Sequence, residues 1–432
     1  MPRSVSFGSR TIVIYHIVSK LADFHAPRAL TMTPILRYQP SANIAQLRES
    51  ATIAVSAKAK ALKAAGRQII DLGAGEPDFD TPSFINEAAA KAVQNGATRY
   101  TATEGILPLR EAIAAQANAT YKGADRVLAG DIVVSTGSKQ SLFNACFTLF
   151  GPGDEVLIPV PSWTSYFEMV ELARATVVPV AGEALRGFKV TAAQLAKAAT
   201  PRTKGLMLNS PVNPTGSVYD EAELRSILDL ASERGWWVLC DEIYQRIAYT
   251  SASAPGAFDV ATTRDNLIVI NGVAKAYAMT GWRIGWTISQ PAVAKAMTAF
   301  QSHTTSNPAA VSQHAALAAM TRTAEADAAI AAMVSQFRAR RDSAMAILRQ
   351  DPRIEVVAPD GAFYLFIRAP KTASGEDAGS AFAAKLLDQA SVAVVPGSAF
   401  LTPDWIRASY AAEQSEVDEA MRRIVAAYAS PA

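Results

Sequence analysis

The feature that most constrains the fold is a series of short apolar runs, rich in β-branched residues, between residues 130 and 290. They read DIVVS, EVLIPV, TVVPV, GLMLNS, WWVLCD, LIVI and RIGWTIS. Most are separated by loops or by helical patterns such as residues 219–234, where apolar positions recur at helical spacing and acidic residues come early. Strands that alternate with helices predict a three-layer α/β fold with a mostly parallel central sheet.

The sequence also predicts a second, smaller domain. Residues 324–350 form an alanine-rich helical pattern, and the strand-like runs IEVV, FYLFI and VAVVP follow it. We expect residues 80–323 to form a large domain and residues 35–79 plus 324–432 to form a small α+β domain built from both chain ends. The long helix would join the two, with its basic run FRARRD as a solvated face. Residues 1–34 are expected to be a disordered N-terminal extension.

Composition excludes several classes of partner. Among 432 residues, 41 Lys and Arg oppose 39 Asp and Glu, so no basic face for nucleic acid or for a membrane surface is expected. No apolar run approaches the length of a membrane span. The two cysteines, Cys146 and Cys240, lie in apolar segments and indicate buried free thiols. No His, Cys and Asp cluster has metal-ligand spacing, so no metal is expected. A cytoplasmic enzyme acting on small molecules fits best.

In open parallel sheets, ligands bind outside the carboxyl ends of the strands, so the residues after each run are the candidates for a binding site. After DIVVS, Gly137 and Ser138 form a tight turn before a helix, a pattern that can bind phosphate but is also common at ordinary helix starts. After EVLIPV comes Trp163, which could stack on a flat ring or pack in the core. After GLMLNS, the rigid turn PVNPTG presents the amide of Asn213.

The next two runs end in charged residues. Asp241 ends the very apolar WWVLC run, where a carboxylate is costly unless it meets a cation or hydrogen-bond donors, and Tyr244 follows one helical turn later. Lys275 follows LIVI, and Arg283 comes eight residues further on. Lys275 alone could be a solvated loop residue, and Arg283 could simply contact the tryptophans beside it.

One ligand uses the whole set. Pyridoxal 5'-phosphate has an aldehyde that condenses with a lysine amine, a pyridine nitrogen that pairs with an acid, and a phosphate that suits a glycine turn and a guanidinium. The strand ends therefore predict a pyridoxal-phosphate enzyme.

The motifs NGVAKAYAMTGWRIGW, SPVNPTG, DEIY and GAGEPDFDTP resemble those of class I pyridoxal-phosphate aminotransferases of fold type I. More narrowly, they resemble the bacterial aspartate and prephenate aminotransferase branch. The resemblance runs from about residue 35 to the C-terminus. It implies that an L-amino acid passes its amino group to a 2-oxo acid by a ping-pong mechanism in a homodimer with shared active sites.

The resemblance also implies a role for each matching residue. Lys275 would bind the cofactor aldehyde and carry the proton, Asp241 would pair with the ring nitrogen, and Trp163 would stack on the ring. Asn213 and Tyr244 would bind the ring hydroxyl, while Gly137, Ser138, Lys139 and Arg283 would hold the phosphate. The resemblance further implies that Tyr100 reaches the neighbouring subunit's phosphate, that Gly75 and Arg407 hold the substrate α-carboxylate, and that Trp163 and Asn213 contact substrate.

Two positions depart from the pattern of the family. Val212 replaces a common asparagine, and Ala274 stands where many relatives have a phosphate-binding serine, so the phosphate site has one donor fewer. Neither departure changes the expected cofactor.

The expected substrate is aspartate or glutamate, with prephenate as a candidate acceptor. Lys139 and Arg48 are the candidate cations for the distal carboxylate; alternatively, Lys139 only supports the phosphate and Arg48 is solvated. Three other functions stay open: a pyridoxal-phosphate lyase or decarboxylase, an aminotransferase for neutral or aromatic amino acids, and a transcription regulator with an aminotransferase-like domain. The last is disfavoured because residues 1–34 lack two helical patterns.

Overall fold

A computed structural model describes residues 38–45, 47, 51–121, 123, 125–371 and 377–429. The chain divides into two compact units, residues 1–46 and residues 47–432. In the first unit, a short turn places the amides of Ile44 and Ala45 at 3.0 Å from the carbonyl of Ser41. The predicted extension, residues 1–34, lies outside the described residues, and so does Arg48.

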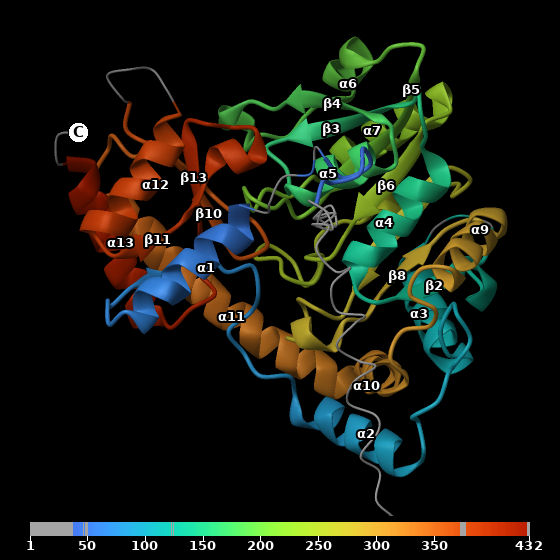
Figure 1. Cartoon of the computed structure of the whole chain (residues 1–432). Helices are drawn as coiled ribbons and strands as arrows, with labels where there is room; N and C mark the ends of the chain where they lie inside the picture. The colour runs from blue at the N-terminus through green and yellow to red at the C-terminus, as the bar shows by residue number, and fades with distance from the viewer. Residues whose placement is uncertain are drawn as a thin grey trace, which may run out of the picture. The chain divides into compact units, whose positions relative to one another are not determined.

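The larger unit contains a seven-stranded sheet with the strand order β2-β8-β7-β6-β5-β3-β4 (Figure 1). Only β8 runs antiparallel to its neighbours, β7 and β2, so the predicted mostly parallel sheet is confirmed. Each of the seven apolar runs forms one strand. The strands are β2 (Ile132–Ser135), β3 (Glu155–Val160), β4 (Thr176–Ala181), β5 (Thr203–Asn209), β6 (Trp237–Asp241), β7 (Leu267–Gly272) and β8 (Gly285–Ile288).

Helices cover both faces of this sheet, because successive strand residues point to opposite sides. In β5, Leu206 and Leu208 pack in one core, and Met207 packs in the other. The first core contains residues of α2 (Ser83–Gln94), α3 (Leu107–Thr120), α6 (Ala192–Ala198), α7 (Glu221–Arg234), α8 (Ala257–Val260) and α10 (Ala310–Thr321). The second contains residues of α4 (Ser138–Leu149), α5 (Ser165–Leu172) and α9 (Pro291–Ser302).

The predicted helix at residues 219–234 is α7, and local chemistry sets its ends. The Asp220 side chain accepts a hydrogen bond from the Glu223 amide at 2.8 Å, and the Glu223 carboxylate accepts one from the Asp220 amide at 3.0 Å. This reciprocal cap satisfies two backbone donors at the first turn. The helix ends at Gly235, which adopts the left-handed conformation with φ 65°.

The two chain ends share smaller sheets. Strands β1 (Ile70–Asp71) and β11 (Val392–Ala393) are parallel, and a four-stranded sheet has the order β12 (Val395–Pro396), β13 (Trp405–Ser409), β10 (Tyr364–Arg368) and β9 (Val356–Val357). Helices α1 (Ala51–Ala64), α12 (Ala378–Gln389) and α13 (Gln414–Ala429) accompany them. The expected domain boundaries stay a prediction.

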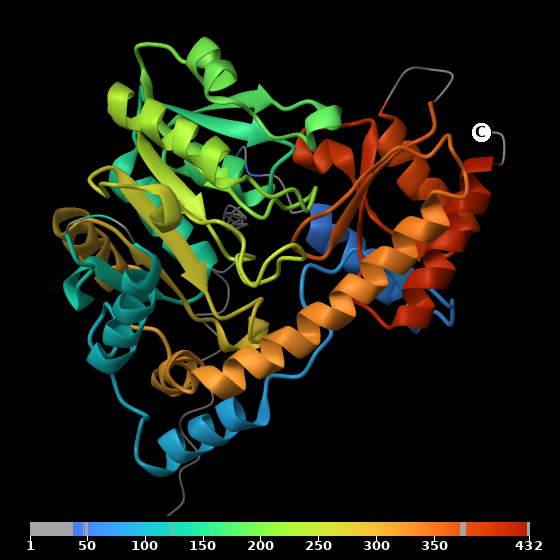
Figure 2. The same cartoon turned by 180° about the vertical axis from the view of Figure 1, so that it is seen from behind.

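Helix α11 (Thr323–Leu348) runs from a core of the seven-stranded sheet to the core of the four-stranded sheet (Figure 2). Ile330 packs in a core of the seven-stranded sheet, whereas Leu348, near the other end, packs with β10. The interpretation of FRARRD as a solvated face is wrong for Arg340, which is buried and lies 2.7 Å from the Asp78 carboxylate. Its guanidinium also lies 5.7 Å from the Phe337 ring centroid. A carboxylate partner outside the helix cannot be read from helical spacing.

No helix among the described residues is long and apolar enough to span a membrane.

Candidate active site

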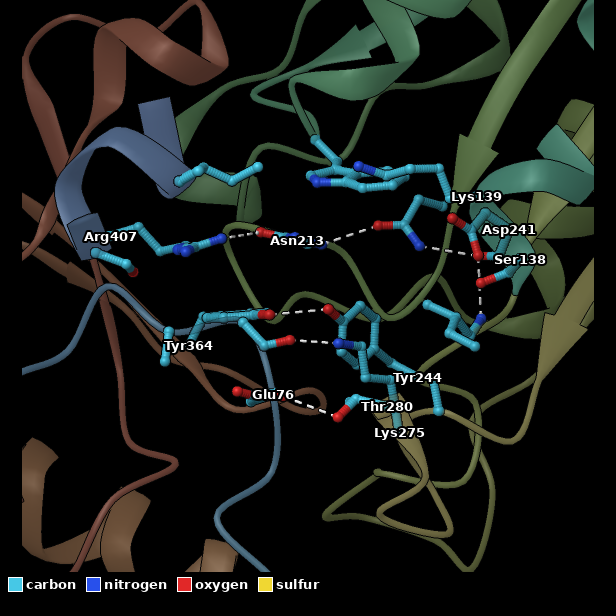
Figure 3. A pocket seen from close by; sticks show the side chains of 18 of the residues that line it. Glu76, Ser138, Lys139, Asn213, Asp241, Tyr244, Lys275, Thr280, Tyr364 and Arg407 are labelled. Carbon is cyan, nitrogen blue, oxygen red and sulfur yellow. Dashed lines mark hydrogen bonds between the residues drawn. The ribbon is translucent and has the colours of Figure 1, made fainter. Parts of the chain in front are cut away.

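A cavity of about 680 Å³ lies at the carboxyl ends of the central strands, facing β10, β13 and α1 (Figure 3). Cavities of this size suit a cofactor together with a small substrate. Most of the residues predicted for the site line it. They are Gly75, Ser138, Lys139, Trp163, Asn213, Asp241, Tyr244, Lys275, Arg283 and Arg407.

One end of the cavity is a cradle suited to an anion. Gly137 has φ 85° and precedes α4, which begins at Ser138. A Cβ atom on Gly137 would lie 2.4 Å from Nη2 of Arg283, so only glycine lets the guanidinium lie against this turn. A guanidinium and the free backbone amides of a helix N-terminus together favour a phosphate.

The tryptophans beside Arg283 position the segment that carries it. The Trp282 indole donates to the Thr81 hydroxyl at 3.1 Å, and Trp286 is buried on β8. Arg283 follows the short 3-10 helix η4 (Thr280–Trp282), adopts φ 56°, and donates from Nη1 to the Thr280 carbonyl at 2.8 Å. The indoles therefore fix the backbone on both sides of a guanidinium that points to the cradle.

Asp241 is buried at the end of β6. Its carboxylate accepts hydrogen bonds from the Tyr166 hydroxyl at 2.5 Å and from the Ile243 amide at 3.2 Å. Burial raises the pKa of Asp241 to about 6, although both hydrogen bonds oppose this shift. Tyr166 is not among the residues predicted from the sequence, although it follows Trp163 by three residues, at the start of α5.

Asn209 ties neighbouring strand ends together. Its side-chain oxygen accepts from the Asn213 amide at 2.9 Å, and its side-chain nitrogen donates to the Asp241 carbonyl at 2.8 Å. Asn209 was also missed, although it is a polar residue that ends an apolar strand. The same rule that selected Asp241 could have found it.

Lys275 is half-buried and directs its amine across the cavity (Figure 3). Its Nζ donates to the carbonyl of Gly75 and lies 5.8 Å from the Tyr244 ring centroid. Burial lowers the pKa of Lys275 to about 8; Arg407 and Arg283 lower it as well, whereas Glu76 and Asp241 act to raise it. The amine is therefore closer to its neutral form at physiological pH than an ordinary lysine.

Arg407, on β13, faces Lys275 across the cavity and is 1% exposed. Its Nη1 donates to the side-chain oxygen of Asn213 at 2.9 Å, and its Nη2 donates to the Gly73 carbonyl at 2.9 Å. Its Nε is buried and has no hydrogen-bond partner among the described residues. Burial lowers the pKa of Arg407. A buried guanidinium with an unused donor is suited to a carboxylate ligand.

Tyr364 was missed by the sequence analysis. Its hydroxyl is 2.8 Å from that of Tyr244, and its ring lies under the Arg407 guanidinium at 4.5 Å. Tyr244 thus has a protein partner for its hydroxyl. The two tyrosines are 120 residues apart, and no local sequence signal links them.

Lys139 lies between the indole and the cradle. Its Nζ is 4.9 Å from the Trp163 ring centroid, and Trp163 meets Tyr166 edge-on at 5.4 Å. Burial lowers the pKa of Lys139, and the charge of Arg283 lowers it further. Tyr100 does not line the cavity of its own chain and is 91% exposed. Among the described residues, no group of His, Cys, Asp and Glu could hold a metal ion.

Comparison with known proteins identifies the family. The model of the family "Aminotransferase class I and II" matches residues 67–424, and the chain belongs to this family. It is an aminotransferase, as the sequence motifs predicted.

Two bacterial relatives are similar over nearly their whole length. The aspartate aminotransferase of Streptomyces avermitilis is 42% identical over 91% of this chain and 97% of the relative. The aspartate/prephenate aminotransferase of Cereibacter sphaeroides is 40% identical over 89% of this chain and 98% of the relative.

A solved structure shares the fold. The aspartate aminotransferase of Thermus thermophilus with maleate superimposes with a TM-score of 0.85 at 36% identity, covering 90% of this chain and all of the other. The predicted fold class is therefore confirmed.

Proposed function

We propose that this chain binds pyridoxal 5'-phosphate and transfers the amino group of aspartate or glutamate to a 2-oxo acid, with prephenate as a further candidate acceptor. The observation that carries the proposal is the arrangement of three groups around one cavity. Lys275 stands between a buried acid, Asp241, and a buried guanidinium with an unused donor, Arg407. The relatives named as aspartate and aspartate/prephenate aminotransferases support the substrate class.

The residues present fit the proposed cofactor. The Gly137 turn lets the Arg283 guanidinium lie beside the start of α4, where a phosphate could meet both. The buried Asp241 carboxylate needs a cation, which the ring nitrogen would provide. Trp163 lines the cavity as a flat surface for the ring. We assign Ser138 and Arg283 to the phosphate and Asn213 and Tyr244 to the ring hydroxyl.

Bound pyridoxal phosphate supplies an aldehyde for the amino group and a ring that accepts the electrons left when the α-proton leaves. Residues of the chain control the protonation of the ring and the transfer of the α-proton. Asp241 keeps the ring nitrogen protonated, and the neutral Nζ of Lys275 takes the proton from the substrate Cα. The lowered pKa of Lys275 favours this step, because a larger fraction of the amine is unprotonated near neutral pH.

Arg407 would orient the substrate. Its guanidinium and the backbone of Gly75 both line the cavity and can bind the α-carboxylate, which fixes Cα beside Lys275. Because Arg407 donates a hydrogen bond to Asn213, this single interaction connects the proposed carboxylate site with the proposed ring site.

A second cation would select acidic substrates. Lys139 lines the cavity next to Trp163, and Arg48 is the second candidate. We expect Lys139→Ala to lower kcat/KM for aspartate and glutamate by roughly a hundredfold, because removing one partner of a desolvated charge pair costs about 2–5 kcal/mol. Alanine and phenylalanine should be affected far less.

Steady-state kinetics with a panel of donors and both 2-oxoglutarate and oxaloacetate would test this. Lys58→Ala, which removes an exposed lysine of α1 outside the cavity, is the matched control. Equal losses for acidic and neutral donors would assign Lys139 to the phosphate instead. A wild-type preference for aromatic donors would overturn the acidic substrate and leave the aminotransferase.

The proposed assembly is a cytoplasmic homodimer in which Tyr100 reaches the phosphate of the partner subunit. The exposure of Tyr100 and its absence from its own cavity support this. A hybrid of Tyr100→Phe and Lys275→Ala protomers would contain one site with both native residues. We expect that site to bind the cofactor with wild-type affinity in an equilibrium titration. If the sites are independent, the hybrid will keep the weaker affinity of Tyr100→Phe.

A pyridoxal-phosphate lyase would share most of these cofactor residues. It would release a product without consuming a 2-oxo acid. Product analysis with and without 2-oxoglutarate therefore separates the two activities.

A further inference from the structure

The segment after β1 lines the cavity and is hydrogen-bonded to the segment that leads to Arg283. The Thr280 hydroxyl donates to Oε2 of Glu76 at 2.8 Å (Figure 3). The Thr81 hydroxyl donates to the Ala278 carbonyl at 2.6 Å. Further along, Asp78 pairs with Arg340 of α11. Glu76 is the acidic residue of this segment that lines the cavity, and it directly follows Gly75.

Lys275 meets charges of both signs. Arg407 and Arg283 face it as cations, Asp241 and Glu76 face it as carboxylates, and the ring of Tyr244 lies 5.8 Å away. Glu76 directly follows Gly75, whose carbonyl accepts the hydrogen bond from Nζ of Lys275. In the proposed function, the Asp241 carboxylate pairs with the ring nitrogen of the cofactor. Glu76 then remains as the carboxylate that can balance a proton on Lys275.

We propose that Glu76 is a positioning residue for Lys275. The Glu76 carboxylate, held by the Thr280 hydroxyl, keeps the Gly75 carbonyl in hydrogen-bonding position for Nζ of Lys275 and balances the positive charge of the lysine. The inference rests on the proposed role of Lys275 and adds a residue to it. Lys275 must be neutral to take the α-proton and charged while it holds it. The two nearby arginines disfavour the charged form of Lys275, whereas the Glu76 carboxylate favours it.

The size of the effect follows from the exposure of Glu76. Its side chain is open to solvent, and the charge interaction is therefore screened. An interaction of this kind changes an equilibrium by about two- to fivefold. Glu76→Gln should thus raise the neutral fraction of Lys275 by about two- to fivefold at pH 7, while glutamine still accepts the hydrogen bond from Thr280.

The test measures the lysine directly and does not depend on catalysis. The cofactor-free, full-length protein is labelled with a trace of acetic anhydride from pH 6 to 10, and mass spectrometry gives the acetylation rate of Lys275. In Glu76→Gln, the midpoint of the Lys275 profile should move to lower pH. Thr280→Val should move it in the same direction, since the released carboxylate turns to solvent. The double variant should match Glu76→Gln alone.

The matched control is Asp80→Asn, which removes an exposed carboxylate four residues away that does not line the cavity. It should leave the Lys275 profile unchanged. An unchanged profile in Glu76→Gln, or an equal shift in Asp80→Asn, would overturn the proposal. So would a Glu76→Gln enzyme that loses activity with an unaltered Lys275 profile, because that result indicates a purely structural tether. Failure of the proposed function itself would appear separately, as transamination that survives in Lys275→Ala.

Discussion

Lys275→Ala is expected to fold and to lose amino-group transfer by about 10²–10⁴-fold from the missing proton transfer alone. The reason is geometric: Nζ of Lys275 lies in the cavity between Asp241 and Arg407, where the substrate Cα would be held. The variant should also lose the near-visible absorbance of the lysine-bound cofactor. Circular dichroism and the melting profile would establish that the fold is intact.

Chemical rescue separates the role of the amine from that of packing. A small amine such as methylamine fits the space left by the lysine side chain and should partly restore exchange of the α-proton of aspartate. Lys275→Arg is the matched variant, since it keeps a cation in the site but cannot act as a base near neutral pH. Normal activity in Lys275→Ala without added amine would remove Lys275 from the proposed mechanism.

Asp241→Ala is expected to weaken cofactor binding and to slow α-proton removal, by on the order of 10²–10⁴-fold overall. Removing one partner of a buried ion pair costs about 3–5 kcal/mol, because the other charge stays buried without compensation. Dialysis against buffer, followed by phosphate analysis, would measure retention of the cofactor. Single-turnover rates at saturating cofactor would measure the chemical step.

The ionisation of Asp241 also predicts how cofactor binding changes with pH. The pKa of Asp241 is raised to about 6 in the cofactor-free protein, so the carboxylate is ionised above that pH and neutral below it. Cofactor association should therefore weaken as the pH falls through about 6, and Asp241→Asn should lack this transition. Tyr166→Phe, which removes only the hydrogen bond to Asp241, is the matched control and should keep the transition. Unchanged single-turnover rates in Asp241→Ala would contradict the assignment.

The sequence predicted the central sheet and the residues at its strand ends for one physical reason. Parallel strands bring their carboxyl ends to one edge, so Asn213, Asp241 and Lys275 converge although they are far apart in the chain. The same reasoning placed Trp163 and the Gly137 turn near them. These positions follow from local patterns together with a topology that the patterns imply.

Residues that depend on tertiary contacts were beyond this reasoning. Tyr364 reaches Tyr244 from a strand of another sheet, and Arg340 is buried because Asp78, remote in sequence, meets it. Strand β13, which carries Arg407, was not predicted as a strand because the buried polar residues Arg407 and Ser409 interrupt the apolar run by which other buried strands were recognised. The family resemblance supplied Arg407 where periodicity did not.

The displaced pKa values of Asp241 and Lys275 also bear on how long the protein survives in a cell. Burial disfavours the charged form of both side chains, so a newly made chain without cofactor folds around two groups that are unfavourably placed. A ligand that binds only the folded chain stabilises it by about 2.7 kcal/mol at a concentration 100 times its Kd. Proteases act on the unfolded fraction, and that fraction shrinks as the ligand binds. The cellular amount of this enzyme is thus expected to follow the supply of its cofactor, even at a constant rate of synthesis.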